Sequence, residues 1–380
     1  MQGITRRSFL GGASALTLGT HPWSGFGSDV VREQVLLVGT QTAEPSTSKG
    51  IYGYRFNAET GELTQIGLAV EAENPTFLAL GRREKFVYAV NEVRQGTVSS
   101  FSFDKRSMKM QEISKVSSNG GGPTHIAVDH TGRCVFAANY GGGSVASFQV
   151  NGSGQLSEAV SFFQYSADEE KHERKPHAHR VTVSPDNRFL LVNDLGLDVI
   201  HVYRLDASTA KLTPHDPPLW RAKTGYGPRA LQFHTKGRVA YCVNELKPTV
   251  NVLEWDGERG VLTTLQDVSL VPEGYNGNAA PSDLAFDRKM SFAYVASRLD
   301  DFIATFAVSP ADGKLTMIGK TSCGGKRPRH LVVDPTDRWL LIANQDTDTI
   351  AVFARDSETG KVANEGKTFP LSRPQCLVFV

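Results

Sequence analysis

The chain has 380 residues, and its 41 basic and 40 acidic side chains leave a formal charge of only +1. This balance, without any basic tract, argues against a nucleic-acid-binding protein. The length alone allows two or three domains, but a repeat that runs through most of the chain favours a single one. We therefore expect a signal and linker in residues 1–32 and one folded domain in residues 33–380.

The chain begins with a pattern typical of protein export. Arg6 and Arg7 precede Ser8–Leu10, and a weakly apolar run continues to Thr20. Such a pair is read by the twin-arginine (Tat) export machinery. The run is shorter than the roughly 20 residues of a membrane-spanning helix, so no membrane span is expected in the mature chain. The expected location is the periplasm or the exterior, with the cytoplasm as the alternative.

The stretch Gly122–Val150 is a template for most of the remaining sequence. It contains three short apolar runs separated by turns, and its leading proline returns at steps of 46–53 residues. Propeller blades repeat every ~40 to 50 residues. The leading prolines are Pro75, Pro123, Pro176, Pro228, Pro281, Pro328 and Pro374. We number the blades from one to seven in this order.

The two ends of the repeat region complement each other. Residues 33–70 contain three strand-like runs without a leading run, whereas Pro374–Val380 is a leading run with nothing after it. Together they make one blade, which would close the ring and cover free sheet edges. The sequence therefore predicts an all-β fold, a seven-bladed β-propeller closed by one C-terminal strand and three N-terminal strands.

Neither a metal nor a cofactor is expected. The four cysteines show no metal or disulfide spacing, and we expect buried free thiols at Cys134, Cys242, Cys323 and Cys376. The four tryptophans do not recur in register, which argues against a quinone-dependent propeller dehydrogenase. Calcium-dependent propeller lactonases use oxygen ligands, which Glu92, Asp194 and Glu245 would offer. Those enzymes have six blades, so the predicted seven argue against calcium.

Polar residues gather where the first strand of each blade begins and the second strand ends. Antiparallel pairing brings these two points to the same face of the propeller. In blades three to five they include two histidines two residues apart, expected on the same side of a strand. They also include two arginines and a glutamate. The residues are His177, His179, Arg229, Glu245 and Arg298.

This set suits chemistry on an anionic substrate. Guanidinium groups bind carboxylates or phosphates at two points and stabilise a developing oxyanion. A histidine or glutamate of suitable pKa moves a proton or activates water. The alternative is that such groups only link neighbouring blades, as in a noncatalytic propeller that binds a ligand or a protein.

Several motifs carry a resemblance to a known family: Ser48–Tyr52, Gly122–His125, Ala138–Tyr140, Pro176–His179, Asn193–Gly196, Gly227–Arg229, Val243–Leu246 and Arg327–His330. In these motifs residues 33–380 resemble the seven-bladed propeller lactonases, which include a bacterial type of 6-phosphogluconolactonase and the fungal carboxy-cis,cis-muconate cyclases. The resemblance implies His177, Arg229, Glu245 and Arg298 as the catalytic group, with His179 as the alternative to His177. Blade four departs from the family pattern, because Ala230 stands where a histidine is usual.

The expected function is hydrolysis of a sugar-type, anionic lactone, as by a 6-phosphogluconolactonase of carbohydrate metabolism. Arg229 and Arg298 would hold the anion and polarise the carbonyl, with Glu245 or His177 as the base. Further substrate contacts are expected from His125, Asn139, Tyr140, His179, Asp194, Arg329 and His330. A cofactor-free cycloisomerase that opens or closes a lactone by proton transfer is the leading alternative. Since 6-phosphogluconolactone arises inside cells, an exported enzyme is expected to meet another lactone. The sequence carries no signal for oligomeric state.

Overall fold

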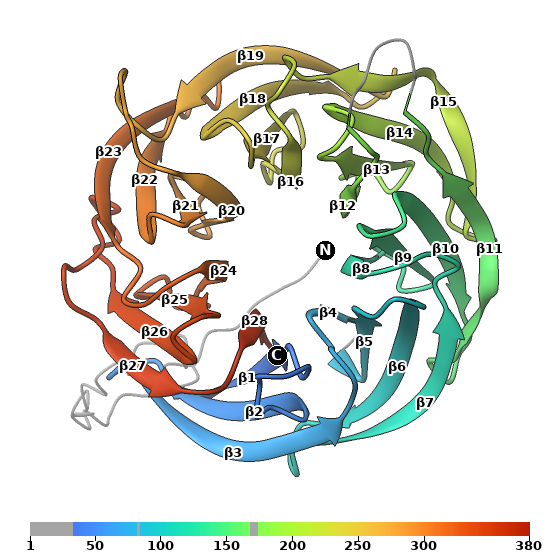
Figure 1. Ribbon diagram of the computed structural model, residues 1–380, viewed down its shortest axis with the longest axis horizontal. Helices are drawn as coiled ribbons and strands as arrows, with labels where there is room; N and C mark the ends of the chain where they lie inside the picture. The colour runs from blue at the N-terminus through green and yellow to red at the C-terminus, as the bar shows by residue number, and fades with distance from the viewer. Residues whose placement is uncertain (1–32, 82–83, 168–173) are drawn as a thin grey trace, which may run out of the picture. The chain divides into compact units, whose positions relative to one another are not determined.

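The computed structural model describes residues 33–81, 84–167 and 174–380. These residues form 28 β-strands in seven four-stranded sheets. Figure 1 shows the sheets as blades around a common axis. The predicted seven-bladed β-propeller is thereby confirmed. The predicted export signal lies in residues 1–32, outside the described residues, and none of the described residues forms a helix that could span a membrane.

Each blade is an antiparallel sheet of four strands whose first strand is innermost. In blades one to six the four strands are consecutive in the chain, whereas in blade seven the first strand comes from the C-terminal end of the folded domain. Blade one consists of β4 (Phe77–Leu80), β5 (Phe86–Asn91), β6 (Thr97–Asp104) and β7 (Lys109–Ser117). Blade two consists of β8 (Pro123–Val128), β9 (Cys134–Asn139), β10 (Ser144–Val150) and β11 (Leu156–Gln164). Blade three consists of β12 (Ala178–Val183), β13 (Phe189–Asp194), β14 (Val199–Asp206) and β15 (Lys211–Arg221).

The next three blades repeat this order. Blade four consists of β16 (Pro228–Phe233), β17 (Val239–Asn244), β18 (Thr249–Asp256) and β19 (Val261–Ser269). Blade five consists of β20 (Ala280–Phe286), β21 (Phe292–Arg298), β22 (Phe302–Val308) and β23 (Leu315–Ser322). Blade six consists of β24 (Pro328–Val333), β25 (Trp339–Asn344), β26 (Thr349–Ala354) and β27 (Lys367–Pro370).

Blade seven joins the two ends of the folded domain. Its strands are β28 (Pro374–Phe379), β1 (Glu33–Thr40), β2 (Gly50–Asn57) and β3 (Glu62–Glu71). The innermost strand β28 pairs antiparallel with β1, with Val378 opposite Leu37. The predicted closure of the ring by strands from both ends is confirmed.

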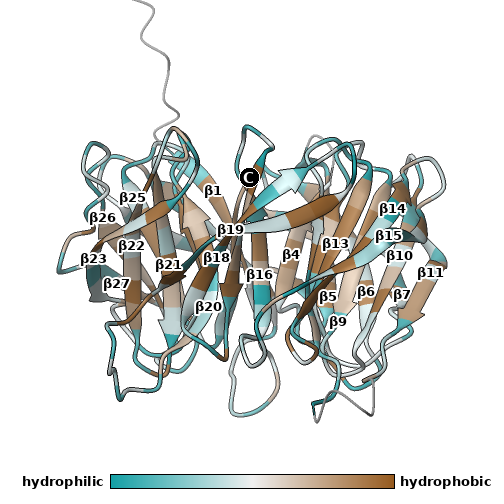
Figure 2. Cartoon of the chain, turned by 90° about the horizontal axis from the view of Figure 1, so that it is seen from above, coloured by the Kyte–Doolittle hydropathy of each residue, from teal (hydrophilic) through white to brown (hydrophobic). Residues whose placement is uncertain are grey.

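The hydrophobic core lies between the blades. Seven buried clusters each combine side chains from two neighbouring blades, one cluster for every interface in the described ring. At one interface the rings of Tyr241 and Phe286 lie 4.8 Å apart. Second strands such as β9 are buried along their whole length because both faces are covered. Outer strands such as β11 alternate between buried and more exposed residues. In Figure 2 hydrophobic colour is concentrated in the strands, and many loops are hydrophilic.

All four cysteines lie in this core, buried and free, as expected. Burial raises the pKa of the Cys134, Cys323 and Cys376 thiols to about 12. These thiols therefore stay protonated at neutral pH and pack as small apolar groups.

Blade three differs in register from the predicted repeat. In blades two, four and six the leading proline lies opposite the residue that ends the second strand, in the pairs Pro123–Asn139, Pro228–Asn244 and Pro328–Asn344. In blade three Ala178 lies opposite Asp194, so Pro176 precedes the strand by two residues. Alignment on Pro176 was therefore wrong in this blade. A shift of two residues keeps the alternation of a strand, which explains why the sequence pattern did not reveal it.

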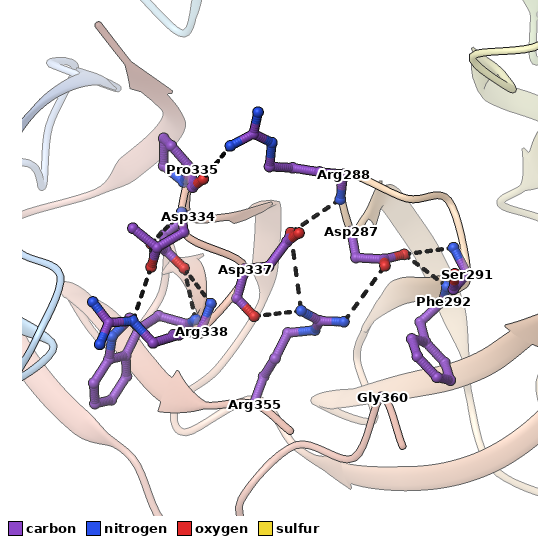
Figure 3. Close-up of polar contacts among 12 residues, drawn as sticks. Asp287, Arg288, Ser291, Phe292, Asp334, Pro335, Asp337, Arg338, Arg355 and Gly360 are labelled. Carbon is purple, nitrogen blue, oxygen red and sulfur yellow. Dashed lines mark hydrogen bonds and ion pairs between the residues drawn. The ribbon is translucent and has the colours of Figure 1, made fainter. Parts of the chain in front are cut away.

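A buried arginine links blades five and six on the face opposite the one where the first strands begin. The Arg355 side chain is fully buried there and its Nε donates to the Tyr294 hydroxyl at 2.6 Å. Its terminal nitrogens lie 3.8 Å from Oδ2 of Asp287 and 3.9 Å from Oδ1 of Asp337 (Figure 3). Asp287 also accepts from the main-chain N–H of Phe292 at 2.7 Å, so one arginine connects the turns of two blades.

Candidate active site

The first-strand starts and second-strand ends form one face, which we call the mouth. At the start of the first strand of blades two to seven, one residue is skipped in the pairing with the second strand, as in a β-bulge. A β-bulge changes the direction of the side chain at the skipped residue, which the regular alternation of a strand would otherwise fix. The skipped residues and their counterpart in blade one form the inner ring: Thr76, Thr124, His179, Arg229, Ser282, Arg329 and Gln375.

Two further layers flank the inner ring. The rim contains the residues that follow or end the second strands: Gln41, Glu92, Tyr140, Leu195, Glu245, Arg298 and Gln345. The second ring contains the residues after the inner ring: Phe77, His125, Arg180, Ala230, Asp283, His330 and Cys376. A cavity of about 30 Å³ is lined by every inner-ring residue except Ser282, by Glu92 and by most of the second ring. It has room for a water-sized group.

Glu245 on the rim holds two arginines, of which Arg229 lines the cavity. Its Oε2 lies 2.7 Å from Nε of Arg229, and its Oε1 lies 2.6 Å from Nη2 of Arg298. Burial alone would raise the pKa of Glu245, but the charges of Arg229 and Arg298 outweigh burial and lower it. The carboxylate is therefore ionised and both of its oxygens are engaged, which makes it a weak base.

The arginines themselves remain cationic at neutral pH. Burial, together with the charge of Arg298, lowers the pKa of Arg229 to about 9 and that of Arg329 to about 10. Glu245 acts in the opposite direction on both. The mouth thus holds four guanidinium groups, of Arg180, Arg229, Arg298 and Arg329, against three carboxylates, of Glu92, Asp283 and Glu245. The net positive field suits an oxyanion.

His179 is a neutral imidazole within this field. Burial, followed by the charges of Arg229 and Arg329, holds the pKa of His179 well below the ordinary 6.5. The ring of Tyr140 meets His179 edge-on, with centroids 5.5 Å apart. His179 therefore keeps a free lone pair for accepting a proton at physiological pH.

His177 lies outside the strand and contacts Tyr140 instead. Its Nδ1 is 3.0 Å from the main-chain oxygen of Tyr140, and the two rings stack with centroids 4.4 Å apart. Since a carbonyl oxygen only accepts, Nδ1 carries a proton. The expected placement of His177 and His179 on one side of a strand was wrong, because β12 begins at Ala178, between them.

Two other predicted histidines, His125 and His330, lie in the second ring. Nδ1 of His125 accepts from the main-chain N–H of Val181 at 3.4 Å, and Nδ1 of His330 accepts from that of Leu377 at 3.3 Å. Burial lowers the pKa of both imidazoles. Each histidine therefore links its blade to the next, although His125 also lines the cavity.

Asn139 and Asp194 end the second strands of blades two and three, and their side chains hold loops. Asn139 donates to the main-chain oxygen of Ser118 at 3.0 Å. Oδ1 of Asp194 accepts from the main-chain N–H of His177 at 2.8 Å and of Gly196 at 3.0 Å. Both side chains are fully buried and neither lines the cavity.

Of the residues that the sequence singled out, the structure places Arg229, Glu245, Arg298, Arg329 and His179 on one face. It did not select Thr76 and Gln375, which complete the inner ring, or Glu92 as a cavity residue. The sequence carried a signal for each of them: Thr76 and Gln375 directly follow a leading proline, and Glu92 directly follows a second strand. In the parts of the chain that the structure describes, no three His, Cys, Asp or Glu side chains are grouped closely enough to hold a metal ion.

Comparison with known proteins gives the family. The family model "Lactonase, 7-bladed beta-propeller" matches residues 35–379. A 6-phosphogluconolactonase of Bacillus subtilis (strain 168) is 32% identical over 347 residues, spanning 90% of this chain and 97% of its own. One from Formosa agariphila is 29% identical, spanning 86% and 94%. The structure of a periplasmic gluconolactonase from Pseudomonas aeruginosa is similar at 33% identity and a TM-score of 0.87, with 92% and 99% covered. With its match from the first strand to the last, the chain belongs to the lactonase family of seven-bladed β-propellers.

Proposed function

We propose that this protein hydrolyses a sugar-type lactone at the mouth of the propeller. The observation that carries the proposal is the clamp in which Glu245 holds Arg229 and Arg298 beside one cavity. The names of similar proteins, 6-phosphogluconolactonase and gluconolactonase, also support the proposal. The proposed role of the clamp is to receive the carbonyl oxygen of the lactone.

Ester hydrolysis passes through a tetrahedral intermediate whose oxygen carries negative charge. Arg229 faces Glu245 through Nε, so the two terminal nitrogens of Arg229 remain to bind the negatively charged oxygen of the intermediate. Because the carboxylate fixes both guanidinium groups before the substrate arrives, the donors need little reorganisation as charge develops. The same groups then face the carboxylate of the product.

His179 is the proposed general base. It accepts a proton from water as the water oxygen attacks the carbonyl carbon. When the bond from the carbonyl carbon to the ring oxygen breaks, the proton passes to that ring oxygen and yields a hydroxy acid. Glu245 is unsuited to this role because both of its oxygens already face guanidinium groups. His177 is proposed to fix Tyr140, which flanks His179.

The deciding experiment measures lactone consumption by the purified protein in ¹⁸O-labelled water, with the spontaneous rate subtracted. Hydrolysis puts one labelled oxygen into the product, whereas a cycloisomerase transfers only protons. The Arg298→Ala and Glu245→Gln variants accompany the wild type. Catalysed rates that stay unchanged in both variants would exclude the clamp as the active site. A saturable partner without turnover of any lactone would favour a noncatalytic propeller.

We also propose that the enzyme works outside the cytoplasm. Support comes from Arg6 and Arg7 at the start of the chain and from the similar Pseudomonas aeruginosa protein, which is described as periplasmic. A lactone available there, rather than a phosphorylated intermediate of sugar metabolism, is the substrate that this location implies.

A further inference from the structure

Two neighbouring inner-ring residues carry buried polar atoms that have no hydrogen-bond partner among the described residues. Thr76 and Gln375 are each only 6% exposed. Within the described ranges, Oγ1 of Thr76 and Nε2 of Gln375 have no hydrogen-bond partner, and both residues line the cavity at the mouth. Neither residue takes part in the arginine clamp. Buried polar groups are normally satisfied, so this pair points to a ligand atom.

The equivalent hydroxyls in other blades show that the feature is particular to Thr76. Thr124 donates to the main-chain oxygen of His179 at 3.2 Å. Ser282 donates to the main-chain oxygen of Pro328 at 2.7 Å. At the same ring position, these hydroxyls join their blades to the next blade. The Thr76 hydroxyl makes no such bond and remains for the cavity.

Arg329 fixes the orientation of the Gln375 amide. Its Nε donates to Oε1 of Gln375 at 3.0 Å. A guanidinium nitrogen only donates, so the amide oxygen must face Arg329 and the NH₂ group must point away from it. Arg329 therefore sets the direction of the unsatisfied Gln375 donor.

These groups match an alcohol better than a phosphate. Gln375 offers a donor, Thr76 offers a donor and an acceptor, and the Glu92 carboxylate in the same cavity only accepts. A hydroxyl both donates and accepts, and it fits a space of about 30 Å³. A phosphate dianion is larger than this space. Arg180, Arg229 and Arg329 line the same cavity and would attract it, but the dianion has no hydrogen to donate to the Glu92 carboxylate and is repelled by the charge of that group.

We propose that Thr76 and Gln375 bind a hydroxyl group of the substrate, and that Glu92 selects against a phosphate there. The proposal rests on the lactonase function and narrows its substrate to an unphosphorylated polyhydroxy lactone. This differs from the anionic lactone expected from sequence, because the positive charge at the clamp serves the oxyanion formed during the reaction.

The test compares D-glucono-1,5-lactone, its 6-phosphate and δ-valerolactone, which carries no hydroxyl groups, as substrates of the full chain. Calorimetric binding of D-gluconate is measured in parallel. The variants are Thr76→Val and Gln375→Leu, with Thr182→Val as the matched control because its hydroxyl bonds to the main-chain oxygen of Leu231 away from the mouth.

Thr76→Val and Gln375→Leu should each weaken D-gluconate binding and raise the KM for gluconolactone about fivefold, the effect of one neutral hydrogen bond. Turnover of δ-valerolactone, which brings no hydroxyl to this subsite, should fall less than that of gluconolactone in both variants. The wild type should use the 6-phosphate at least about tenfold less efficiently than gluconolactone, and Glu92→Gln should narrow that difference. Thr182→Val should match the wild type in every assay.

Equal losses on gluconolactone and δ-valerolactone, or a wild-type preference for the 6-phosphate, would overturn the subsite. If no lactone is turned over but Thr76→Val still weakens D-gluconate binding, the hydrolase proposal fails and the subsite stands. If lactones are hydrolysed but neither variant changes gluconolactone KM or D-gluconate binding, the subsite fails alone.

Discussion

Ala178 lies directly opposite Asp194 where blade three begins, and this pairing puts the next residue, His179, into the inner ring with Arg229. We predict that His179→Ala lowers kcat/KM for a hydrolysed lactone by at least about 100-fold, the usual contribution of a general base. His177→Ala should have a smaller effect, since its contacts are with Tyr140. Initial rates corrected for spontaneous hydrolysis provide the comparison.

Thermal unfolding of both variants serves as the control for this comparison. A His179→Ala protein that unfolds at the wild-type temperature but has lost activity supports a chemical role. If His177→Ala proves the more damaging of the two at equal stability, the base assignment moves to His177.

The pH dependence of kcat/KM should report the depressed pKa of His179. Burial and the charges of Arg229 and Arg329 hold that pKa well below 6.5, so the imidazole stays neutral when the pH falls through 6.5. We therefore predict a flat kcat/KM between about pH 8 and 6.5, and a decline only at lower pH as the base becomes protonated. An acidic limb centred near 6.5, the ordinary value of histidine, would indicate a different base.

Glu245→Gln tests whether the carboxylate positions the arginines. The substitution keeps the shape of the side chain but removes the charge between Arg229 and Arg298, whose guanidinium groups then repel each other. We predict a roughly 10- to 100-fold lower kcat from weaker oxyanion stabilisation, with a smaller change in KM. Loss of one partner from a buried ion pair should also lower the free energy of unfolding by about 3–5 kcal/mol.

A surface carboxylate provides the matched control for Glu245→Gln. Glu62 pairs with Lys367, but its side chain is 52% exposed, so Glu62→Gln should leave both activity and unfolding unchanged. If Glu245→Gln lowers stability while kcat stays at the wild-type value, Glu245 has only a structural role.

Much of the fold was predictable because each blade repeats the same steric requirements. A leading proline, a fully buried second strand and a turn recur, and the incomplete runs at residues 33–70 and Pro374–Val380 complement each other. Arg229, Glu245 and Arg298 were singled out from the sequence because charges at repeat-defined positions stand out, and the structure pairs them. The blade-three register was not predictable, since Pro176 mimics the leading position with an even offset that preserves alternation.

Thr76 and Gln375 escaped prediction for a different reason. Threonine and glutamine are ordinary residue types and carry no charge that stands out in the sequence. The equivalent hydroxyl of Thr124 forms a hydrogen bond to the next blade, so the position alone does not indicate a binding role. What distinguishes the pair is the lack of a partner for two buried atoms within the described ranges, which only three-dimensional contacts reveal.

The export proposal predicts that the two arginines decide where the protein accumulates. Replacing both Arg6 and Arg7 with lysine keeps the charge but removes the pair that the Tat machinery recognises. The variant should remain in the cytoplasm, whereas the wild type should be recovered from the periplasm or medium. Cell fractionation with lactonase activity as the readout checks this. Equal export of both proteins would contradict recognition by Tat.

Arg355 offers a test of stability that is separate from catalysis. Its buried guanidinium lies between Asp287 and Asp337 on the face opposite the mouth (Figure 3). Arg355→Met fills a similar volume but leaves the Asp287 carboxylate, which is 4% exposed, without its cation. We predict that the free energy of unfolding falls by about 3–5 kcal/mol while the KM for the lactone is unchanged.

Adding Asp287→Asn to Arg355→Met should restore part of the lost stability, because the second change removes the uncompensated charge. Asp287 also accepts from the main-chain N–H groups of Ser291 and Phe292, both at 2.7 Å, and the asparagine oxygen is able to accept at least one of these bonds. Denaturant unfolding of the single and double variants measures the recovery. If the double variant is less stable than Arg355→Met, the turn contacts of Asp287 outweigh its pairing with Arg355, and the arginine would stabilise the blade interface mainly through its bond to Tyr294.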